Sequence, residues 1–87
     1  MTNSPSPTQD VIVEFLRESC GLGPDAYERT TPLFSSGLLD SFALVAMLSF
    51  AEERFGIRLV LPELSQDTVD TVIAFAAYVD SVRARQA

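Results

Sequence analysis

The most distinct hydrophobic pattern of the chain lies between two glycines, Gly37 and Gly56. Residues 42–55 contain no proline or glycine, and apolar side chains recur there at the spacing of one helical face. The residues of this face are Leu44, Met47, Leu48, Ala51 and Phe55. Asp40 is a good N-cap and Gly56 stands where helices commonly end, so the pattern predicts a helix over residues 41–55. Gly37 is expected to form a tight turn before it.

A first helix is predicted on the N-terminal side of this segment. Residues 1–7 are rich in Ser, Pro and Asn and are expected to form a disordered N-terminal tail. The helix should follow from a cap at Thr8 or Asp10 and end near Ser19, before Gly21. Its apolar stripe consists of Val11, Ile12, Phe15 and Leu16.

Two connections flank the central helix. The connection over residues 22–39 shows no regular spacing of apolar residues. Connections of this length without secondary structure usually have a structural or functional role. Its apolar residues are expected to pack onto the helices and keep it ordered: Leu22, Tyr27, Leu33, Phe34, Leu38 and Leu39. The segment after Gly56 alternates like a strand, but a lone strand lacks a partner and Pro62 would interrupt it. We therefore expect an extended connection and a short helical turn near Pro62 to Ser65.

The last helix is predicted to begin at a Thr68 cap, with Asp67 and Asp70 favourably placed at its positive end. Its inner stripe consists of Val69, Val72, Ile73, Ala76 and Val79. With 87 residues, the chain is expected to form one domain over residues 8–85. The patterns thus predict three main helices, one short helix and a long ordered loop between the first and second main helices.

Composition and charge exclude several classes of function. The chain has six arginines, no lysine, no histidine and a net charge of -6, which argues against binding to nucleic-acid phosphates. No apolar run approaches the length of a membrane span, and residues 1–10 lack the basic and apolar segments of a signal peptide. The single Cys20 cannot form an internal disulfide, so a reducing, cytoplasmic location is expected.

The chain also has few side chains suited to catalysis. Without histidine and lysine, a Ser-His-Asp triad, a Schiff base and histidine ligation of metal are excluded, and one cysteine cannot build a zinc site. The carboxylates of Glu52 and Glu53 are expected to lie on a solvated helix face. We therefore expect no enzyme and no bound metal. The hydroxyl of Ser41 should lie near the positive end of the central helix, where a phosphoester would be favoured.

Four segments in order resemble the attachment-site region of acyl carrier proteins. LFSSGLLDS ends at Ser41 and GLLDSF opens the central helix, AEERFGIRL ends it, and DTVDTVIAFAAYV forms the last helix. The similarity extends roughly from Val11 to Val82. It implies a carrier-protein domain over residues 8–85, folded as an all-α, small right-handed helical bundle. It also implies that 4'-phosphopantetheine is attached covalently to Ser41 and holds an acyl or aminoacyl cargo as a thioester. Asp40 would support recognition of the site.

The resemblance further implies that partner enzymes dock along the central helix. The residues expected to contact them are Phe42, Ala46, Met47, Glu52 and Glu53. Fatty-acid-synthase carriers usually have acidic residues where this chain has Ala43 and Ala46, so docking should depend more on apolar contact. The expected partners are a phosphopantetheinyl transferase, an acyl- or aminoacyl-loading ligase or adenylation enzyme, and a downstream synthase or acyltransferase.

The function expected from these features is that of a stand-alone, monomeric carrier in polyketide or nonribosomal-peptide biosynthesis. Because the GLLDS approach is also similar to D-alanyl carriers of cell-wall modification, that function remains an alternative. A large apolar cavity between the central and last helices would count against a small aminoacyl cargo. The residues alone also permit an unmodified helical protein-interaction domain, which would bind a partner through the exposed apolar edge of the central helix.

Overall fold

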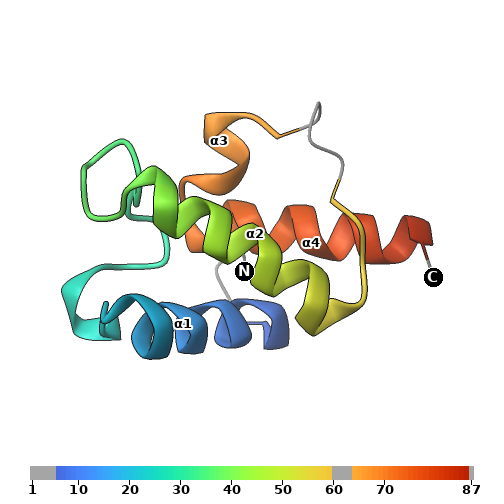
Figure 1. Cartoon of the computed structure of the whole chain (residues 1–87), viewed down its shortest axis with the longest axis horizontal. Coiled ribbons are helices and arrows are strands. Elements are labelled where there is room, and N and C mark those ends of the chain that lie inside the picture. Colours follow the sequence, from blue (N-terminus) through green and yellow to red (C-terminus); the bar gives the residue numbers. More distant parts are fainter. Residues whose placement is uncertain (1–5, 60–63, 87) are drawn as a thin grey trace.

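Every regular element in residues 6–59 and 64–86, which this computed structural model describes, is a helix (Figure 1). The elements are α1 (Pro7–Cys20), the 3-10 helix η1 (Pro24–Ala26), α2 (Ser41–Phe55), α3 (Gln66–Val69) and α4 (Val72–Gln86). The prediction of an all-α bundle with three main helices is confirmed. The short helix was expected near Pro62 to Ser65, but α3 begins one residue after Ser65, and residues 60–63 lie outside the described ones.

Helix α1 begins earlier than the sequence pattern predicts. Ser6 is its N-cap, with the side-chain oxygen accepting from the N–H of Gln9 at 3.1 Å, and Pro7 occupies the first turn. Caps at Thr8 or Asp10 were therefore wrong predictions. Thr8 is buried, and its hydroxyl donates to Asp80 in α4 at 2.6 Å. Of the predicted N-terminal tail, residues 1–5 lie outside the described residues, whereas Ser6 and Pro7 belong to the helix start.

The predicted last helix is divided into α3 and α4, which is a second correction. Ser65, rather than Thr68, caps α3, and the hydroxyl of Thr71 accepts from the N–H of Ala74 at 3.0 Å at the start of α4. The break lies at Asp70, whose side chain leaves the helix to accept hydrogen bonds from the loop before α2. Aspartate commonly competes with helix formation in this way, because its carboxylate offers backbone N–H groups an alternative acceptor.

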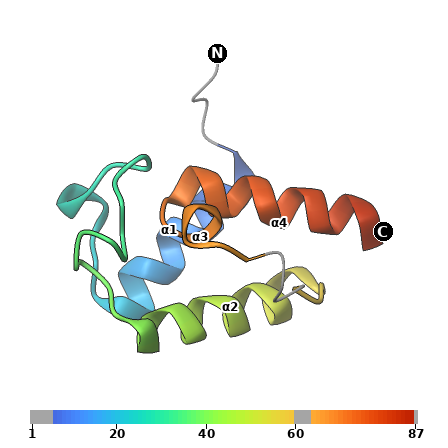
Figure 2. The same cartoon turned by 90° about the horizontal axis from the view of Figure 1, so that it is seen from above.

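The core lies between α1, α2 and α4, which enclose it in two perpendicular views (Figures 1 and 2). Fully buried side chains from these three helices include Ile12, Leu16, Met47, Ala51, Val72, Phe75, Val79 and Val82. Phe15 of α1 stacks on Phe50 of α2, with ring centroids 4.5 Å apart. Such a pair adds about 0.5–1.5 kcal/mol to the apolar burial. This stacked pair holds α2 against α1 within the core.

The loop from Gly21 to Asp40 is ordered by apolar anchors and by backbone hydrogen bonds. Tyr27 and Leu33 are buried, and the partly buried anchors are Leu22, Phe34 and Leu39. Leu38 was also expected to pack inward, but its side chain is 41% exposed, so that prediction was wrong. The N–H of Leu39 donates to the carbonyl oxygen of Leu33 at 2.9 Å, which closes the loop just before α2.

The bundle has two ends of different character. In both views the loop over residues 21–40 and the first turn of α2 lie at one end (Figures 1 and 2). The C-terminal ends of α2 and α4 lie together at the opposite end. A helix rises about 1.5 Å per residue, so α2 separates Ser41 from Phe55 by roughly 20 Å.

Candidate functional site

The site is built around the start of α2, where a turn delivers Asp40 and Ser41. Gly37 has φ +89°, in the left-handed region that favours glycine, and its N–H donates to the carbonyl oxygen of Phe34 at 3.2 Å. Asp40 has extended backbone angles, and its carboxylate accepts from the N–H of Ala43 at 2.9 Å. Asp40 as N-cap, Ser41 as first helical residue and Gly56 as C-cap are therefore all confirmed.

Ser41 presents its hydroxyl to solvent. The residue is exposed, and in the described part of the chain no hydrogen bond engages its side chain. A serine hydroxyl is a weak nucleophile unless a neighbouring base activates it. The sequence contains no histidine or lysine, and the nearest carboxylate on the chain, that of Asp40, already accepts the Ala43 N–H. The geometry is suited to modification of Ser41 by a visiting enzyme.

An apolar groove of about 500 Å³ opens beside Ser41. It lies between α2, the loop before α2, and α3, so it does not lie directly between α2 and α4. Its apolar wall is formed by Phe34, Leu39, Leu44, Leu48, Leu64 and Val69, and its polar rim by Asp40, Ser41, Ser65 and Gln66. Leu44 and Leu48, which belong to the predicted apolar face of the helix, pack against the core and also line this groove.

The position of the groove wall depends on Asp70. Its Oδ1 accepts from the N–H groups of Phe34 at 2.7 Å and of Ser35 at 3.1 Å, and its Oδ2 accepts from the Ser35 hydroxyl at 2.6 Å. We call this set of contacts the Asp70 clasp. The hydrogen bond from the Ser35 hydroxyl, aided by those from the backbone, lowers the pKa of Asp70 although burial opposes the shift. The clasp holds Phe34 and Val69, which line the groove, in one arrangement. Sequence reasoning missed this role, because it placed Asp70 at a helix terminus.

An apolar patch covers the outer side of α2 next to Ser41. Phe42 is 83% exposed, Val45 is 63% exposed and Ala46 is exposed, and Leu38 of the preceding loop adjoins them. A second hollow, of about 380 Å³, is lined by Phe42, Ala46 and Leu38 together with Cys20 of α1. Large exposed apolar side chains grouped in this way commonly mark interaction sites. We call Leu38, Phe42, Val45 and Ala46 the outer patch.

The structure separates the five residues expected to contact partners. Phe42 and Ala46 lie in the outer patch, and Glu53 is exposed. Met47 is only 1% exposed and belongs to the core, so its assignment as a contact residue was wrong. Glu52 is half-buried, and its carboxylate accepts from the N–H of Leu59 at 2.9 Å, which gives it a structural role. Val45 was missed as a contact residue, because the sequence alone does not show that Val45 faces solvent while Met47 faces the core.

Other candidate chemistry is sparse. Cys20 is half-buried, and burial, with a smaller effect of the Asp40 carboxylate, raises the pKa of its thiol. A raised pKa keeps the thiol protonated and unreactive at neutral pH. Among the described residues no group of His, Cys, Asp and Glu side chains is arranged to hold a metal ion. None of the helices in residues 6–59 and 64–86 has the length and apolar character needed to cross a membrane.

The fold and the site define a class of protein: a small helical bundle that presents an unengaged serine at the start of its central helix, next to an apolar groove. Comparison with family models gives a match over residues 10–79 to the family described as phosphopantetheine attachment site. The chain therefore belongs to this family of carrier proteins, whose domains carry 4'-phosphopantetheine covalently on a serine. Such domains are generally non-catalytic and interact with phosphopantetheinyl transferases and acyl-handling enzymes. Comparisons with curated proteins and with solved structures find no match.

Proposed function

We propose that Ser41 is the attachment residue, and that this carrier holds an apolar acyl group in a polyketide-type or nonribosomal-peptide-type pathway. The observation that carries the proposal is the exposed, unengaged Ser41 hydroxyl at the first position of α2, directly after the Asp40 cap. Three of the other serines within the matched region are already engaged, and Ser19 and Ser49 lie inside helices rather than at a helix start. The Ser35 hydroxyl donates to Asp70, that of Ser36 donates to the Pro32 carbonyl oxygen, and Ser65 caps α3.

The residues around Ser41 fit a phosphopantetheine arm. When bound, this group supplies a thiol on which an acyl cargo is held as a thioester. The chain itself offers the Ser41 oxygen at a helix N-terminus, where backbone N–H groups and the helix dipole favour a phosphate. Asp40 fixes that terminus through Ala43, which presents the serine in one orientation to the transferase. Leu44 and Leu48 line the groove that begins at the same point.

The groove favours an apolar acyl cargo over a small polar one. Ligand pockets typically have volumes of about 300–1,000 Å³ and mostly apolar walls, and the groove of about 500 Å³ lies within that range. A D-alanyl group carries a charged amine and would gain nothing from such a wall. We therefore expect an octanoyl group on the arm to raise the Tm of the protein, and a D-alanyl group to leave it unchanged. Equal Tm values for the two loaded forms would contradict this choice of cargo. Leu48→Asn is expected to abolish the octanoyl effect.

The outer patch is proposed as the surface that partner enzymes contact while they act on Ser41. Phe42 and Val45 would supply apolar contact, and exposed Glu53 would add a weak charge contribution at one edge. Phe42→Asp is expected to raise the KM of a broad-specificity phosphopantetheinyl transferase for this carrier protein about tenfold. The kcat should change little, because the substitution affects docking and not the chemical step. An unchanged KM would remove Phe42 from the docking surface.

The decisive experiment is an intact-mass measurement before and after incubation with coenzyme A and that transferase. We expect a gain of one phosphopantetheinyl group in the wild type and none in Ser41→Ala. Ser49→Ala is the matched control, because Ser49 is an exposed serine of the same helix, and this variant should gain the group. A modified Ser41→Ala protein, or an unmodified wild type that is well folded, would refute the assignment.

The exposed outer patch also favours a second candidate, an unmodified protein-interaction domain. The two candidates differ in the effect of Ser41→Ala, which abolishes carrier activity but should leave partner binding by an interaction domain intact. Val45→Asp is a suitable variant for testing the second candidate, because Val45 is 63% exposed and its substitution should preserve the fold, whereas Met47 is a core residue. As a carrier, the protein is proposed to be monomeric and cytoplasmic.

A further inference from the structure

Arginines are concentrated at the end of the bundle that lies opposite Ser41. The protein has a net charge of -6, yet four of its six arginines lie within residues 54–58 and 83–85. These segments are the C-terminal end of α2 with the residues after it, and the C-terminal part of α4. The two helix ends lie side by side in both views (Figures 1 and 2). Glu52, Glu53 and Asp80 belong to the same two helix ends, so residues 52–58 and 80–86 together hold four arginines and three carboxylates, a formal charge of +1 against -7 for the remainder. The arginines thus make this end slightly basic on an otherwise acidic molecule.

This basic surface is organised around one aromatic ring. The guanidinium carbon of Arg83 lies 5.2 Å from the ring centroid of Phe55, and that of Arg54 lies 5.7 Å from it. Both distances are within the range of cation–π attraction, which orders the two guanidinium groups while both residues remain exposed. Arg83 also lies 3.9 Å from the Asp80 carboxylate, but the two side chains are half exposed, so this ion pair is weak.

The backbone beside the ring is also fixed. The N–H of Arg58 donates to the side-chain oxygen of Gln86 at 3.0 Å, and the Gln86 amide donates to the carbonyl oxygen of Arg58 at 2.8 Å. This reciprocal pair ties the segment after α2 to the end of α4. A hollow of about 170 Å³ results, with Phe55 and Ile57 as its apolar part and Arg83 and Gln86 at its edge. We call Arg54, Phe55, Arg58 and Arg83 the arginine end.

We propose that the arginine end is a second docking surface, which binds an acidic protein segment carrying an apolar side chain. Arginine and aromatic residues are enriched at protein interfaces, and guanidinium groups bind carboxylates through paired hydrogen bonds. The hollow, which Arg83 lines at its edge, offers room for one apolar side chain. A long polyanion is a poor occupant, because the acidic remainder of the molecule repels it beyond this small surface.

Such a surface would act independently of Ser41. The two lie at opposite ends of α2, so a partner held at the arginine end leaves Ser41 and the outer patch accessible. A tethered carrier meets its enzymes at a higher effective concentration than a free one. The acidic segment would thus hold the carrier near a partner while Ser41 is modified or its cargo is exchanged.

The test is an NMR titration of the isotope-labelled full chain with a short peptide in which Glu alternates with Ser around one central Leu. Amide shifts should concentrate at residues 54–59 and 83–86, and binding should weaken with added salt. The double variant Arg58→Gln, Arg83→Gln is expected to bind about fivefold to tenfold more weakly. Binding should be unchanged in Ser41→Ala, so the result is independent of the carrier assignment.

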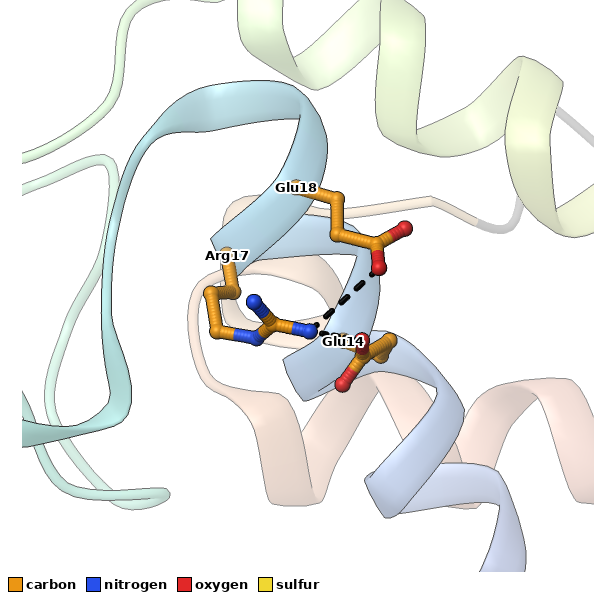
Figure 3. A network of polar contacts seen from close by, with 3 residues as sticks. All are labelled: Glu14, Arg17 and Glu18. Carbon is orange, nitrogen blue, oxygen red and sulfur yellow. Dashed lines mark hydrogen bonds and ion pairs between the residues drawn. The ribbon is translucent and has the colours of Figure 1, made fainter.

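The matched control is Arg17→Gln, which makes the same chemical change on α1. Arg17 forms ion pairs with Glu14 and Glu18, and all three lie on the exposed surface of that helix (Figure 3). This variant should bind the peptide less than about twofold more weakly than the wild type. The proposal is overturned by an absence of binding, by equal binding of a peptide with Gln in place of Glu, or by an unaffected double variant. Tighter binding of oligothymidylate or of phosphatidylglycerol vesicles would overturn the acidic segment as occupant.

Discussion

Replacing Asp70 by asparagine is expected to destabilise the loop that leads to Ser41, because the Asp70 clasp connects two distant parts of the chain. The carboxylate accepts two backbone N–H groups on Oδ1, at 2.7 Å from Phe34 and 3.1 Å from Ser35, and the Ser35 hydroxyl on Oδ2 at 2.6 Å. Asparagine has nearly the same shape and keeps one carbonyl oxygen. The substitution therefore removes mainly the negative charge from an acceptor that is otherwise in place.

The magnitude follows from the donors that lose a charged acceptor. A hydrogen bond to a charged group contributes about 1.5–3 kcal/mol to stability, and a neutral one about 0.5–1.5 kcal/mol. In the variant, both N–H groups donate to a neutral acceptor instead of a charged one. Ser35 is exposed, which reduces the contribution of its hydrogen bonds to stability. We expect Asp70→Asn to lower the free energy of unfolding by about 2 kcal/mol. For a domain of this size, that loss corresponds to a Tm lower by roughly 8–16 °C.

Urea denaturation followed by far-ultraviolet circular dichroism measures this change, and the m-value should remain that of the wild type. Asp25→Asn is the matched control, because Asp25 is an exposed carboxylate of η1 and its loss changes the net charge equally. We expect that variant to lie within about 0.5 kcal/mol of the wild type. Equal stability of Asp70→Asn and Asp25→Asn would refute the stabilising role of the clasp.

The same clasp predicts a dependence of stability on pH. Because the pKa of folded Asp70 is lowered from the usual value of 3.8, its contribution is present above that value and is lost as the pH falls through the folded pKa. The difference in unfolding free energy between the wild type and Asp70→Asn should therefore be constant at neutral pH. It should shrink below about pH 4. A difference that stays constant under acid would show that the charge of Asp70 is not what stabilises the loop.

Three further substitutions test whether particular side chains are buried or exposed. Burial raises the pKa of the Tyr27 hydroxyl, which has no hydrogen-bond partner among the described residues. Tyr27→Phe is therefore expected to raise the free energy of unfolding by about 1 kcal/mol in urea denaturation, and a loss of stability would show that the hydroxyl is satisfied. Met47→Ala should cost about 2–5 kcal/mol by the same measurement, whereas exposed Val45→Ala should cost less than about 0.5 kcal/mol. Equal costs for the two would contradict the orientation of α2.

The ends of the central helix could be predicted from sequence because the interactions that define them are local. Asp40 reaches an N–H only three residues away, and Gly56 ends the helix by its own left-handed backbone, with φ +66°. The same holds for the turn at Gly37, where a positive φ is required. Since the candidate site lies at this helix start, its central residue could be placed without knowledge of the fold.

Two of the errors occurred where distant residues compete with a local preference. Thr8 has the side chain of an N-cap, but its hydroxyl is engaged by Asp80, which is far away in sequence. Asp70 favours a helix terminus, yet the N–H groups of Phe34 and Ser35 draw its carboxylate into the loop and divide the last helix. Nothing in the spacing of these residues indicates such partners. A prediction of them would require the tertiary arrangement of the loop against α3 and α4.

Helix α2 explains why docking residues were the hardest part of the site to predict. A helix with one apolar stripe shows which face is buried, but α2 is apolar on nearly every side. Met47 and Ala51 fill the core, Leu44 and Leu48 line the groove, and Val45 in the outer patch faces solvent. A small bundle can cover only part of the apolar surface of such a helix. The uncovered part is available for contact with other molecules. The feature that obscured the core stripe in the sequence is thus the same one that supports the proposed cargo groove and the proposed docking surface on either side of Ser41.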